Sequence, residues 1–432
     1  METLQGNKKQ FDLSCRVMPG GVSSPARAFV NLNMTPLIAS SGKGSLLYDI
    51  EGTGYIDYCM SFGALILGHG HDKVVEESVK RLKKGSSFGL TTPLEEEFAS
   101  FIVDQMPAIE QLRFVSSGTE ATMTALRLAR GYTQRPLIVK FNGNYHGHCD
   151  ALLVKAGSSV SHINAEASSK GIIKDTLQNT LCLPYNDCET FIKLCRDPFY
   201  AKLIAAVIVE PIAANMGVVL PNRDFLCTLR EETQRIGALC IFDEVITGFR
   251  IGLQGAQGLY SIKPDLTCLG KVIGGGYPLA VVGGRKEVME QLAPIGEVYQ
   301  AGTLSANPVA LQAGLTTLHE ISTPHFFSRL EEKTKCLTEP VRVALQQAQL
   351  KACIQEAGSM FSLFWGVDQV ERFEDLKQMD QELFRKCFHF LIKRGIYFPP
   401  SPFETCFVSL SHTEEDMIKT RRALLDFIDN LR

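Results

Sequence analysis

The stretch Ala238-Leu239-Cys240-Ile241-Phe242-Asp243-Glu244 is a continuous apolar run that ends in two carboxylates. Similar apolar runs occur at 112–115, 137–140, 205–210 and 266–269. Segments with helical periodicity separate these runs. Strands that are apolar on both faces are typical of parallel sheets that helices cover on both sides. The pattern therefore predicts an α/β fold with a mostly parallel central sheet and helices on both faces.

The two ends of the chain have a different pattern. Residues 45–50 and 55–58 read as the two strands of a hairpin, and residues 308–321 begin a region of long helices mixed with strands. We expect a large domain at 66–310 and a smaller α+β domain that is built from both termini, 1–65 and 311–432.

The composition is that of a folded globular protein, with 45% hydrophobic and 21% charged residues among 432. A net charge of −3 supplies no basic field for nucleic acid. Neither a signal peptide nor an apolar run of membrane-spanning length is found, so we expect a cytoplasmic protein without a membrane partner. Thirteen scattered cysteines without a Cys-x-x-Cys pair suit reduced thiols and no zinc site.

Lys271 lies in the glycine-rich run Leu269-Gly270-Lys271-Val272-Ile273-Gly274-Gly275-Gly276, after the strand that ends at Asp243. A lone lysine in such a run is usually a solvated loop charge, and Val272 after it excludes a nucleotide P-loop. An amine there can also form a Schiff base with an aldehyde cofactor, and a strand-end carboxylate can hold a protonated pyridine nitrogen. Pyridoxal phosphate needs both groups.

Polar residues follow three further strands. Ser116-Ser117-Gly118-Thr119-Glu120 opens a helix, which suits a phosphate site, although an ordinary Ser/Thr cap with Glu120 is the alternative. In the segment 142–148, Tyr145 is a candidate to stack on a pyridine ring and His146 to position it. His146 and His148 lack the further ligands of a metal site, so no metal is expected. Asn215 follows the strand at 205–210 and is a candidate donor to a ring hydroxyl.

The segments 242–245, 270–276 and 117–121 together resemble those of the class III, fold-type I, pyridoxal-phosphate aminotransferases. More narrowly, the segments 18–29, 142–148 and 300–308 resemble the glutamate-1-semialdehyde 2,1-aminomutase family. The resemblance runs from about Phe11 to the C-terminus. It implies an enzyme that uses pyridoxal or pyridoxamine phosphate to convert glutamate 1-semialdehyde to 5-aminolevulinate, the tetrapyrrole precursor.

The resemblance also implies roles for individual residues. Lys271 would be the Schiff-base lysine and Asp243 the partner of the pyridine nitrogen. The other implied contacts are phosphate binding by Ser117, Gly118, Thr119 and a neighbouring subunit's Thr303; ring contacts by Tyr145 and His146; a ring-hydroxyl contact by Asn215; substrate contacts by Arg27, Ser24 and Phe62; and a place near the cofactor for Glu404. The role of Thr303 implies a homodimer.

Three positions depart from the family pattern. Phe62 stands where the family often has Trp, Ala280 replaces a more usual pattern after the lysine loop, and the segment 158–171 diverges from the usual glycine-rich gating loop. Rich in Ser and Ala and without clear periodicity, the segment 157–171 is expected to be a mobile loop.

Two rival functions remain at this point. One is an intermolecular aminotransferase on the same scaffold, which commonly binds a donor carboxylate through an arginine near the C-terminal strand; residues 395–420 contain no arginine. The other is a cofactor-binding protein without catalysis, against which the presence of both Lys271 and Asp243 argues.

Overall fold

The large sheet has seven strands. A computed structural model describes residues 5–156 and 165–431 of the chain. In sheet order the strands are β4 (Gln111–Val115), β12 (Ala280–Gly284), β11 (Leu266–Leu269), β10 (Leu239–Glu244), β9 (Ile204–Val209), β5 (Leu137–Phe141) and β8 (Thr180–Leu183). All run parallel except β12, which is antiparallel to both neighbours. The predicted α/β fold with a mostly parallel sheet is confirmed.

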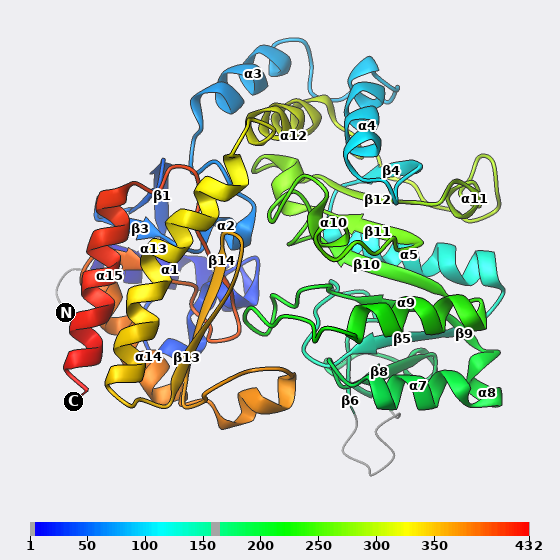
Figure 1. Cartoon of the computed structure of the whole chain (residues 1–432). Coiled ribbons are helices and arrows are strands. Elements are labelled where there is room, and N and C mark those ends of the chain that lie inside the picture. Colours follow the sequence, from blue (N-terminus) through cyan, green and yellow to red (C-terminus); the bar gives the residue numbers. More distant parts are fainter. Residues whose placement is uncertain (1–4, 157–164, 432) are drawn as a thin grey trace.

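Helices cover both faces of this sheet (Figure 1). On β10, Leu239 and Ile241 pack into one apolar cluster with helix α5 (Gly118–Thr133). Cys240 and Phe242 point the other way, into a cluster with α7 (Cys188–Arg196) and α9 (Phe225–Ile236). Because neighbouring residues of a strand face opposite sides, a strand buried on both faces must be apolar throughout.

Two smaller sheets lie beside the large one (Figure 1). The four-stranded sheet contains β1 (Ala39–Lys43), β2 (Leu46–Asp49), β3 (Gly54–Asp57) and β15 (Ile396–Tyr397); the three-stranded sheet contains β13 (Ala352–Ala357), β14 (Met360–Trp365) and β16 (Cys406–Phe407). The predicted hairpin is confirmed as β2 and β3. We call the part around these two sheets the small lobe and the part around the seven-stranded sheet the large lobe. The domain boundaries given above stay a prediction.

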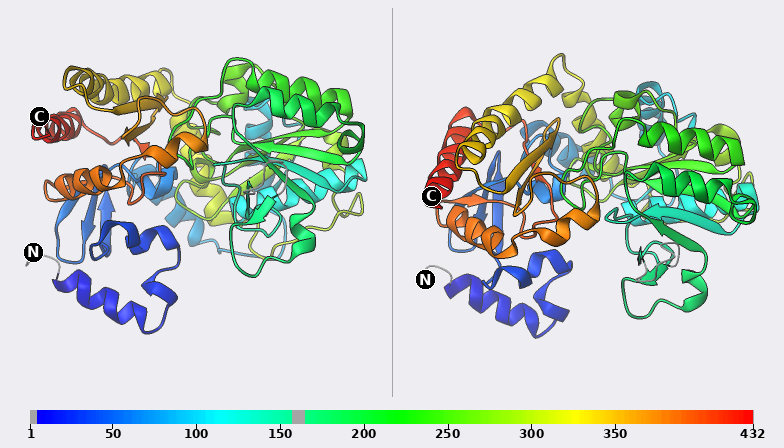
Figure 2. Two further views of the ribbon diagram at one scale, coloured as in Figure 1. Left: turned by 90° about the horizontal axis from the view of Figure 1, so that it is seen from below. Right: turned by 60° about the horizontal axis from the view of Figure 1, so that its bottom comes forward.

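Long helices pack on the small lobe, with both chain ends on that side of the molecule (Figures 1 and 2). They are α13 (Phe326–Gln347), α14 (Gln381–Ile392) and α15 (Glu414–Asp429). Helix α12 (Pro308–Ile321) has the predicted bounds. Its start follows from local chemistry, because Asn307 Oδ1 accepts a hydrogen bond from Ala310 N at 2.9 Å and Pro308 occupies the first turn.

The remaining elements are short or peripheral. The α-helices are α1 (Gln5–Cys15), α2 (Met60–Gly63), α3 (Asp72–Leu82), α4 (Pro93–Gln105), α6 (Lys174–Leu177), α8 (Pro198–Ala201), α10 (Gly255–Tyr260) and α11 (Lys286–Met289). The 3₁₀ helices are η2 (Pro19–Gly21), η3 (Pro25–Ala28), η4 (Val30–Leu32), η5 (Lys271–Gly274) and η6 (Phe373–Gln378).

The segment 157–171 was expected to be a loop throughout, and this expectation is wrong for part of it. Ala165–Ala167 forms strand β7, which pairs antiparallel with β6 (Val154–Ala156). Three residues are too few to show a periodicity in the sequence, and backbone pairing with β6 supplies the hydrogen bonds instead. The rest of the prediction falls partly on 157–164, outside the described residues.

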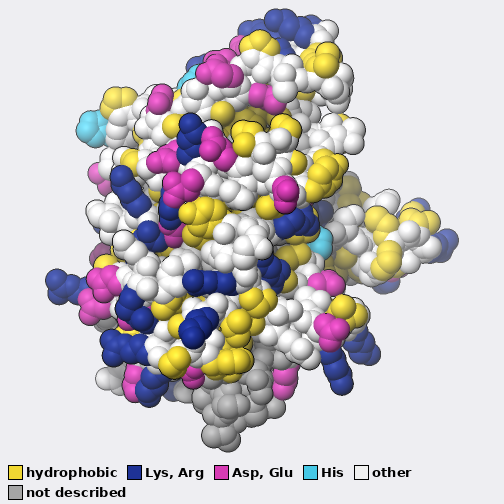
Figure 3. All heavy atoms as spheres, turned by 90° about the vertical axis from the view of Figure 1, so that its right-hand side faces the viewer, with side chains coloured by type: hydrophobic (Ala, Val, Ile, Leu, Met, Phe, Trp, Pro, Cys, Tyr) yellow, Lys and Arg dark blue, Asp and Glu magenta, His cyan; other side chains and the backbone are white. Residues whose placement is uncertain are grey.

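No helix in the described ranges is both long and apolar enough to cross a membrane. On the face shown in Figure 3, Lys and Arg side chains are interspersed with Asp and Glu and with small apolar patches. The prediction about nucleic acid stays a prediction.

Candidate active site

The carboxyl ends of the parallel strands meet at one edge of the large sheet and line a cavity of about 300 Å³. Ligands of open α/β sheets bind at such an edge. Eight of the residues predicted from the sequence lie in the lining: Ser117, Gly118, Thr119, Tyr145, His146, Asn215, Asp243 and Lys271.

One end of the cavity is the N-terminus of α5. Ser117 caps the helix, and its Oγ accepts a hydrogen bond from Glu120 N at 3.2 Å. The Glu120 carboxylate accepts a hydrogen bond from Ser116 N at 2.7 Å. The helix therefore has both the Ser/Thr cap and the open N-terminus that the sequence offered as alternatives. The N–H groups of Gly118 and Thr119 precede the first intrahelical hydrogen bond. With the helix dipole they form a site suited to an anion.

A close backbone approach completes this end of the cavity. Gly147 has a φ of +84°, and a Cβ there would lie 2.4 Å from Thr119 Oγ1 and 2.7 Å from Thr119 Cα. His148 N donates to the same Oγ1 at 3.3 Å. Only glycine allows the loop after β5 to pack this closely on the start of α5.

Asp243 and His146 form a buried pair at the other end. His146 Nδ1 lies 2.7 Å from Asp243 Oδ2, and Val245 N donates to Asp243 Oδ1 at 3.1 Å. Burial lowers the pKa of His146, while the hydrogen bond to Asp243 acts in the opposite direction. A neutral imidazole that donates from Nδ1 leaves Nε2 as an acceptor, and Nε2 is buried without a partner in the described part of the chain. This pair holds the carboxylate in a fixed orientation.

The sequence analysis missed Glu210, which is 3% exposed and also lines the cavity. Its carboxylate accepts hydrogen bonds from Tyr145 N at 2.7 Å, Ala214 N at 2.8 Å and Asn215 Nδ2 at 3.0 Å. Burial, with the nearby charge of Asp243, raises the pKa of Glu210 to about 7. Glu210 therefore ties together two segments that carry predicted ring contacts. Its place directly after a strand, before Pro211, was the signal in the sequence.

Lys271 follows β11 and has a φ of +48°, which is unusual for a residue with a side chain. Burial lowers its pKa, and the charges of Glu404 and Glu210 act in the opposite direction. A lowered pKa leaves more of the amine unprotonated near neutral pH, as a nucleophile or a base requires.

Glu404 reaches this region from the small lobe, between β15 and β16. Burial raises its pKa, and the charge of Lys271 lowers it. Glu404 also contributes to the raised pKa of Tyr145, whose main cause is burial. Glu404 therefore influences the pKa of two residues that line the cavity, and its predicted place near the cofactor stays a prediction.

Five predicted residues do not line the cavity, and Glu404, described above, is one of them. Arg27 is exposed on η3, and Ser24 precedes that helix. Phe62 is half-buried in a left-handed turn at the end of α2. Thr303 is exposed in a turn before α12. Their proposed roles stay predictions.

Comparison with known proteins decides the family. The model of the family described as "Aminotransferase class-III" matches residues 29–402. The chain belongs to the class III aminotransferase family. Class III relatives named glutamate-1-semialdehyde 2,1-aminomutase include one from Protochlamydia amoebophila, 50% identical over 96% of both chains, and one from Thermosipho africanus, 51% identical over 95% of this chain and 96% of the relative.

Solved structures agree with the class III fold. An omega-transaminase from Sphaerobacter thermophilus matches with a TM-score of 0.91 and 30% identity, over 99% of this chain and 98% of that one. A glutamate-1-semialdehyde aminomutase from Pseudomonas aeruginosa, solved in complex with PMP, matches with a TM-score of 0.89 over 100% of this chain and 96% of that one. At 22% identity, the second likeness supports the fold alone.

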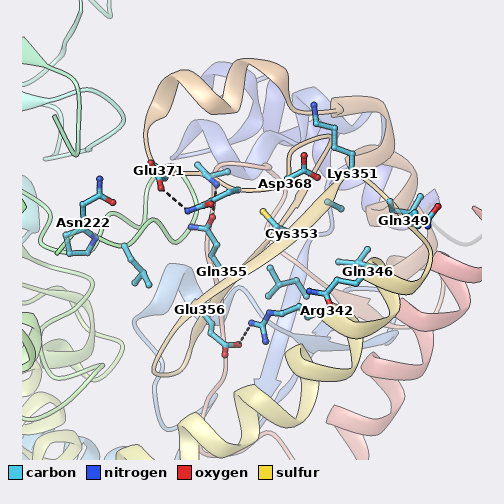
Figure 4. Close-up of a pocket in the computed structure, with 18 residues that line it drawn as sticks. Asn222, Arg342, Gln346, Gln349, Lys351, Cys353, Gln355, Glu356, Asp368 and Glu371 are labelled. Atoms are coloured by element: carbon cyan, nitrogen blue, oxygen red, sulfur yellow. Dashed lines mark hydrogen bonds and ion pairs between the residues drawn. The ribbon is translucent and has the colours of Figure 1, made fainter.

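A larger cavity of about 1030 Å³ lies in another part of the protein (Figure 4). It lies between β13, α13 and the loop around Asn222, and its charged groups include Arg342, 3.4 Å from Glu356. It contains none of the residues predicted for the site. Among the described residues there is also no group of three or more His, Cys, Asp or Glu side chains that could hold a metal ion.

Proposed function

We propose that the protein converts glutamate 1-semialdehyde to 5-aminolevulinate, in tetrapyrrole biosynthesis, with pyridoxal phosphate or its pyridoxamine form as cofactor. The observation that carries the proposal is the identity of about half of all positions with glutamate-1-semialdehyde 2,1-aminomutases over nearly the full length of both chains. The structure supports it with a cavity that joins a reactive amine, a buried carboxylate and an anion site.

The cavity fits this cofactor. The open N–H groups of α5, with Ser117 and Thr119, suit its phosphate. The buried Asp243 suits a protonated ring nitrogen, because a fixed negative charge favours the cationic form of the ring. The unpartnered Nε2 of His146 adds a buried polar atom beside that carboxylate. When bound, the cofactor supplies an electron-accepting ring and a carbon that carries the amino group between substrate positions.

The remaining ring contacts follow from the geometry of the lining. Asn215 would donate to the ring hydroxyl, and its amide is oriented by a hydrogen bond to Glu210 at 3.0 Å. Tyr145 is half exposed on the cavity side and would contact the ring face. Glu210 would fix both positions, because it binds Tyr145 through the backbone and Asn215 through the side chain.

Lys271 would move protons at the reacting carbon. Its burial favours the neutral amine, which can accept a proton, and Glu404 on the opposite side can stabilise the ammonium form that results.

Substrate contacts by Arg27, Ser24 and Phe62 are part of the proposal. A guanidinium at Arg27 suits the substrate carboxylate, since Arg binds carboxylates in a bidentate manner. We also propose a homodimer in which Thr303 reaches the phosphate of the other subunit. The exposure of Thr303 supports this, as do its exposed apolar neighbours Tyr299 (71%) and Leu304 (58%).

A cytoplasmic location belongs to the same proposal. None of the thirteen cysteines, all of which lie in the described ranges, forms a disulfide, as suits a reducing compartment.

A conversion assay without an amino donor tests the proposal. Purified protein loaded with pyridoxamine phosphate is mixed with glutamate 1-semialdehyde alone, and 5-aminolevulinate is measured over many turnovers. We expect sustained turnover, and loss of activity by about 10³-fold or more in Lys271→Ala. A strict requirement for a second amino acid or oxo acid would instead favour the intermolecular aminotransferase.

A further inference from the structure

Arg250 is a buried cation that the function described above does not use. It follows β10 in a turn of the large lobe and is only 1% exposed. Burial lowers its pKa to about 9, and no carboxylate among the described residues acts against this. A buried guanidinium without a counter-ion is costly, so its place in the fold calls for a reason.

The side-chain contacts of Arg250 reach across to the small lobe. Its Nη1 donates to Ser359 Oγ at 3.1 Å, and its Nη2 donates to Gly63 O. The guanidinium carbon lies 4.8 Å from the ring centroid of Phe407. The Nε is buried and has no partner in the described ranges. One side chain thus joins the turn after β10 to three separate segments of the small lobe.

The contact with Gly63 ends a strained turn. In helix α2 (Met60–Gly63), the first three residues are not glycines, yet their φ values are +45°, +55° and +54°. Such left-handed residues persist only where the surroundings hold them. Asp57 Oδ1 accepts from the backbone at the start of the turn, and Arg250 binds its last carbonyl. A Cβ on Gly63 would lie 2.7 Å from the Phe407 ring, so the turn is tightly fitted.

Arg250 also acts on the reactive amine. Burial has the largest effect on the pKa of Lys271, and it lowers it. The charges of Glu404 from the small lobe, Glu210 after β9 and Asp243 on β10 all raise this pKa. Among the described residues, Arg250 is the cation that acts against these carboxylates, and it lowers the pKa of Lys271. Loss of Arg250 would leave three carboxylates to favour the ammonium form.

We propose that Arg250 is a positioning residue for amino transfer: it fixes the turn Met60–Gly63 against the large lobe and balances the carboxylates around the Lys271 amine. The inference rests on the proposed function only in taking Lys271 as the reactive group. Because Phe62 lies within this turn, the same residue fixes the segment that carries a proposed substrate contact.

The test measures the Lys271 amine without cofactor or substrate. Full-length protein is acetylated in competition at a series of pH values, and mass spectrometry of the Lys271 peptide gives the midpoint of its reactivity. We expect the midpoint to move to higher pH in Arg250→Met and in Arg250→Gln, and to stay near the native value in Ser359→Ala, which keeps the charge. Arg130→Met is the control, because Arg130 is a partly buried arginine that, like Arg250, donates to a backbone carbonyl, here Pro136 O.

A native midpoint in folded Arg250→Met and Arg250→Gln would overturn the proposal. If neither neutral variant folds, Arg250→Lys decides. A lysine keeps the charge but cannot bind both Gly63 O and Ser359, so amide hydrogen exchange at residues 60–65 should accelerate. Native protection there would overturn the proposal as well. Neither readout depends on the substrate, so failure of the conversion assay is a separate outcome.

Discussion

Glu210→Gln tests the electrostatics of the site through protein stability. In the folded protein the pKa of Glu210 is raised from 4.5 to about 7, mainly by burial. A carboxyl with a raised pKa stabilises the fold fully when the pH is below 4.5, and this contribution is lost as the pH rises through about 7. Between pH 5 and pH 8 the loss amounts to about 2 to 3 kcal/mol.

The glutamine variant does not titrate. It keeps one carbonyl oxygen, which can serve Tyr145 N and Asn215 Nδ2, but its amide leaves Ala214 N without an acceptor. The unpaired buried N–H costs about 1 to 3 kcal/mol at every pH. We therefore expect the stability of Glu210→Gln, relative to the native protein, to improve by about 2 to 3 kcal/mol from pH 5 to pH 8.

Urea unfolding of the cofactor-free protein, followed by circular dichroism at pH 5, 6, 7 and 8, measures this difference. Glu97→Gln is the control, because Glu97 is exposed and its substitution should give a difference that is flat with pH. A flat difference for Glu210→Gln as well would refute the reasoning about its burial.

Three further predictions concern cofactor binding and the reactive amine. Asp243→Asn should weaken binding of pyridoxal phosphate about tenfold to a hundredfold by spectroscopic titration, since a hydrogen bond to a charged group is worth about 1.5 to 3 kcal/mol. Gly147→Ala should weaken binding of inorganic phosphate and of the cofactor in calorimetry, because the added Cβ would lie 2.4 Å from Thr119 Oγ1. Glu404→Gln should move the acetylation midpoint of Lys271 to lower pH, because the Glu404 charge raises the pKa of that amine.

Each of these predictions has its own control or contrary result. Gly52 has a similar φ of +80°, but no atom lies within 4 Å of a Cβ added there. Gly52→Ala therefore separates the effect of backbone strain from that of the clash, and this variant should bind phosphate normally. Native cofactor affinity in Asp243→Asn would remove that carboxylate from the ring-nitrogen site. An unchanged midpoint in Glu404→Gln would mean that Glu404 does not act on the amine.

The central sheet and most of the cavity could be predicted because both follow from local sequence. Buried parallel strands are apolar throughout, and polar residues directly after them must gather at one edge. Asp243 and Lys271 were found in this way. Strand β12 was missed because it begins just after a glycine-rich run and ends in Gly283 and Gly284, which strands usually avoid.

Other features depend on contacts that are distant in the sequence. Arg250 gave no signal, because its partners Gly63, Ser359 and Phe407 come from three segments of another lobe. Arg27 was expected at the substrate, yet the structure of one chain has it exposed on η3. Contacts between segments that are far apart in the sequence follow from the folded arrangement or the assembled protein, and not from a local sequence pattern.

The most direct test of the central claim is chemical trapping at the proposed amine. The protein is loaded with pyridoxal phosphate, reduced with borohydride, digested and mapped by mass spectrometry. The pyridoxyl group should be found on Lys271. A label on another lysine, or no label on a fully loaded protein, would contradict the assignment of this cavity.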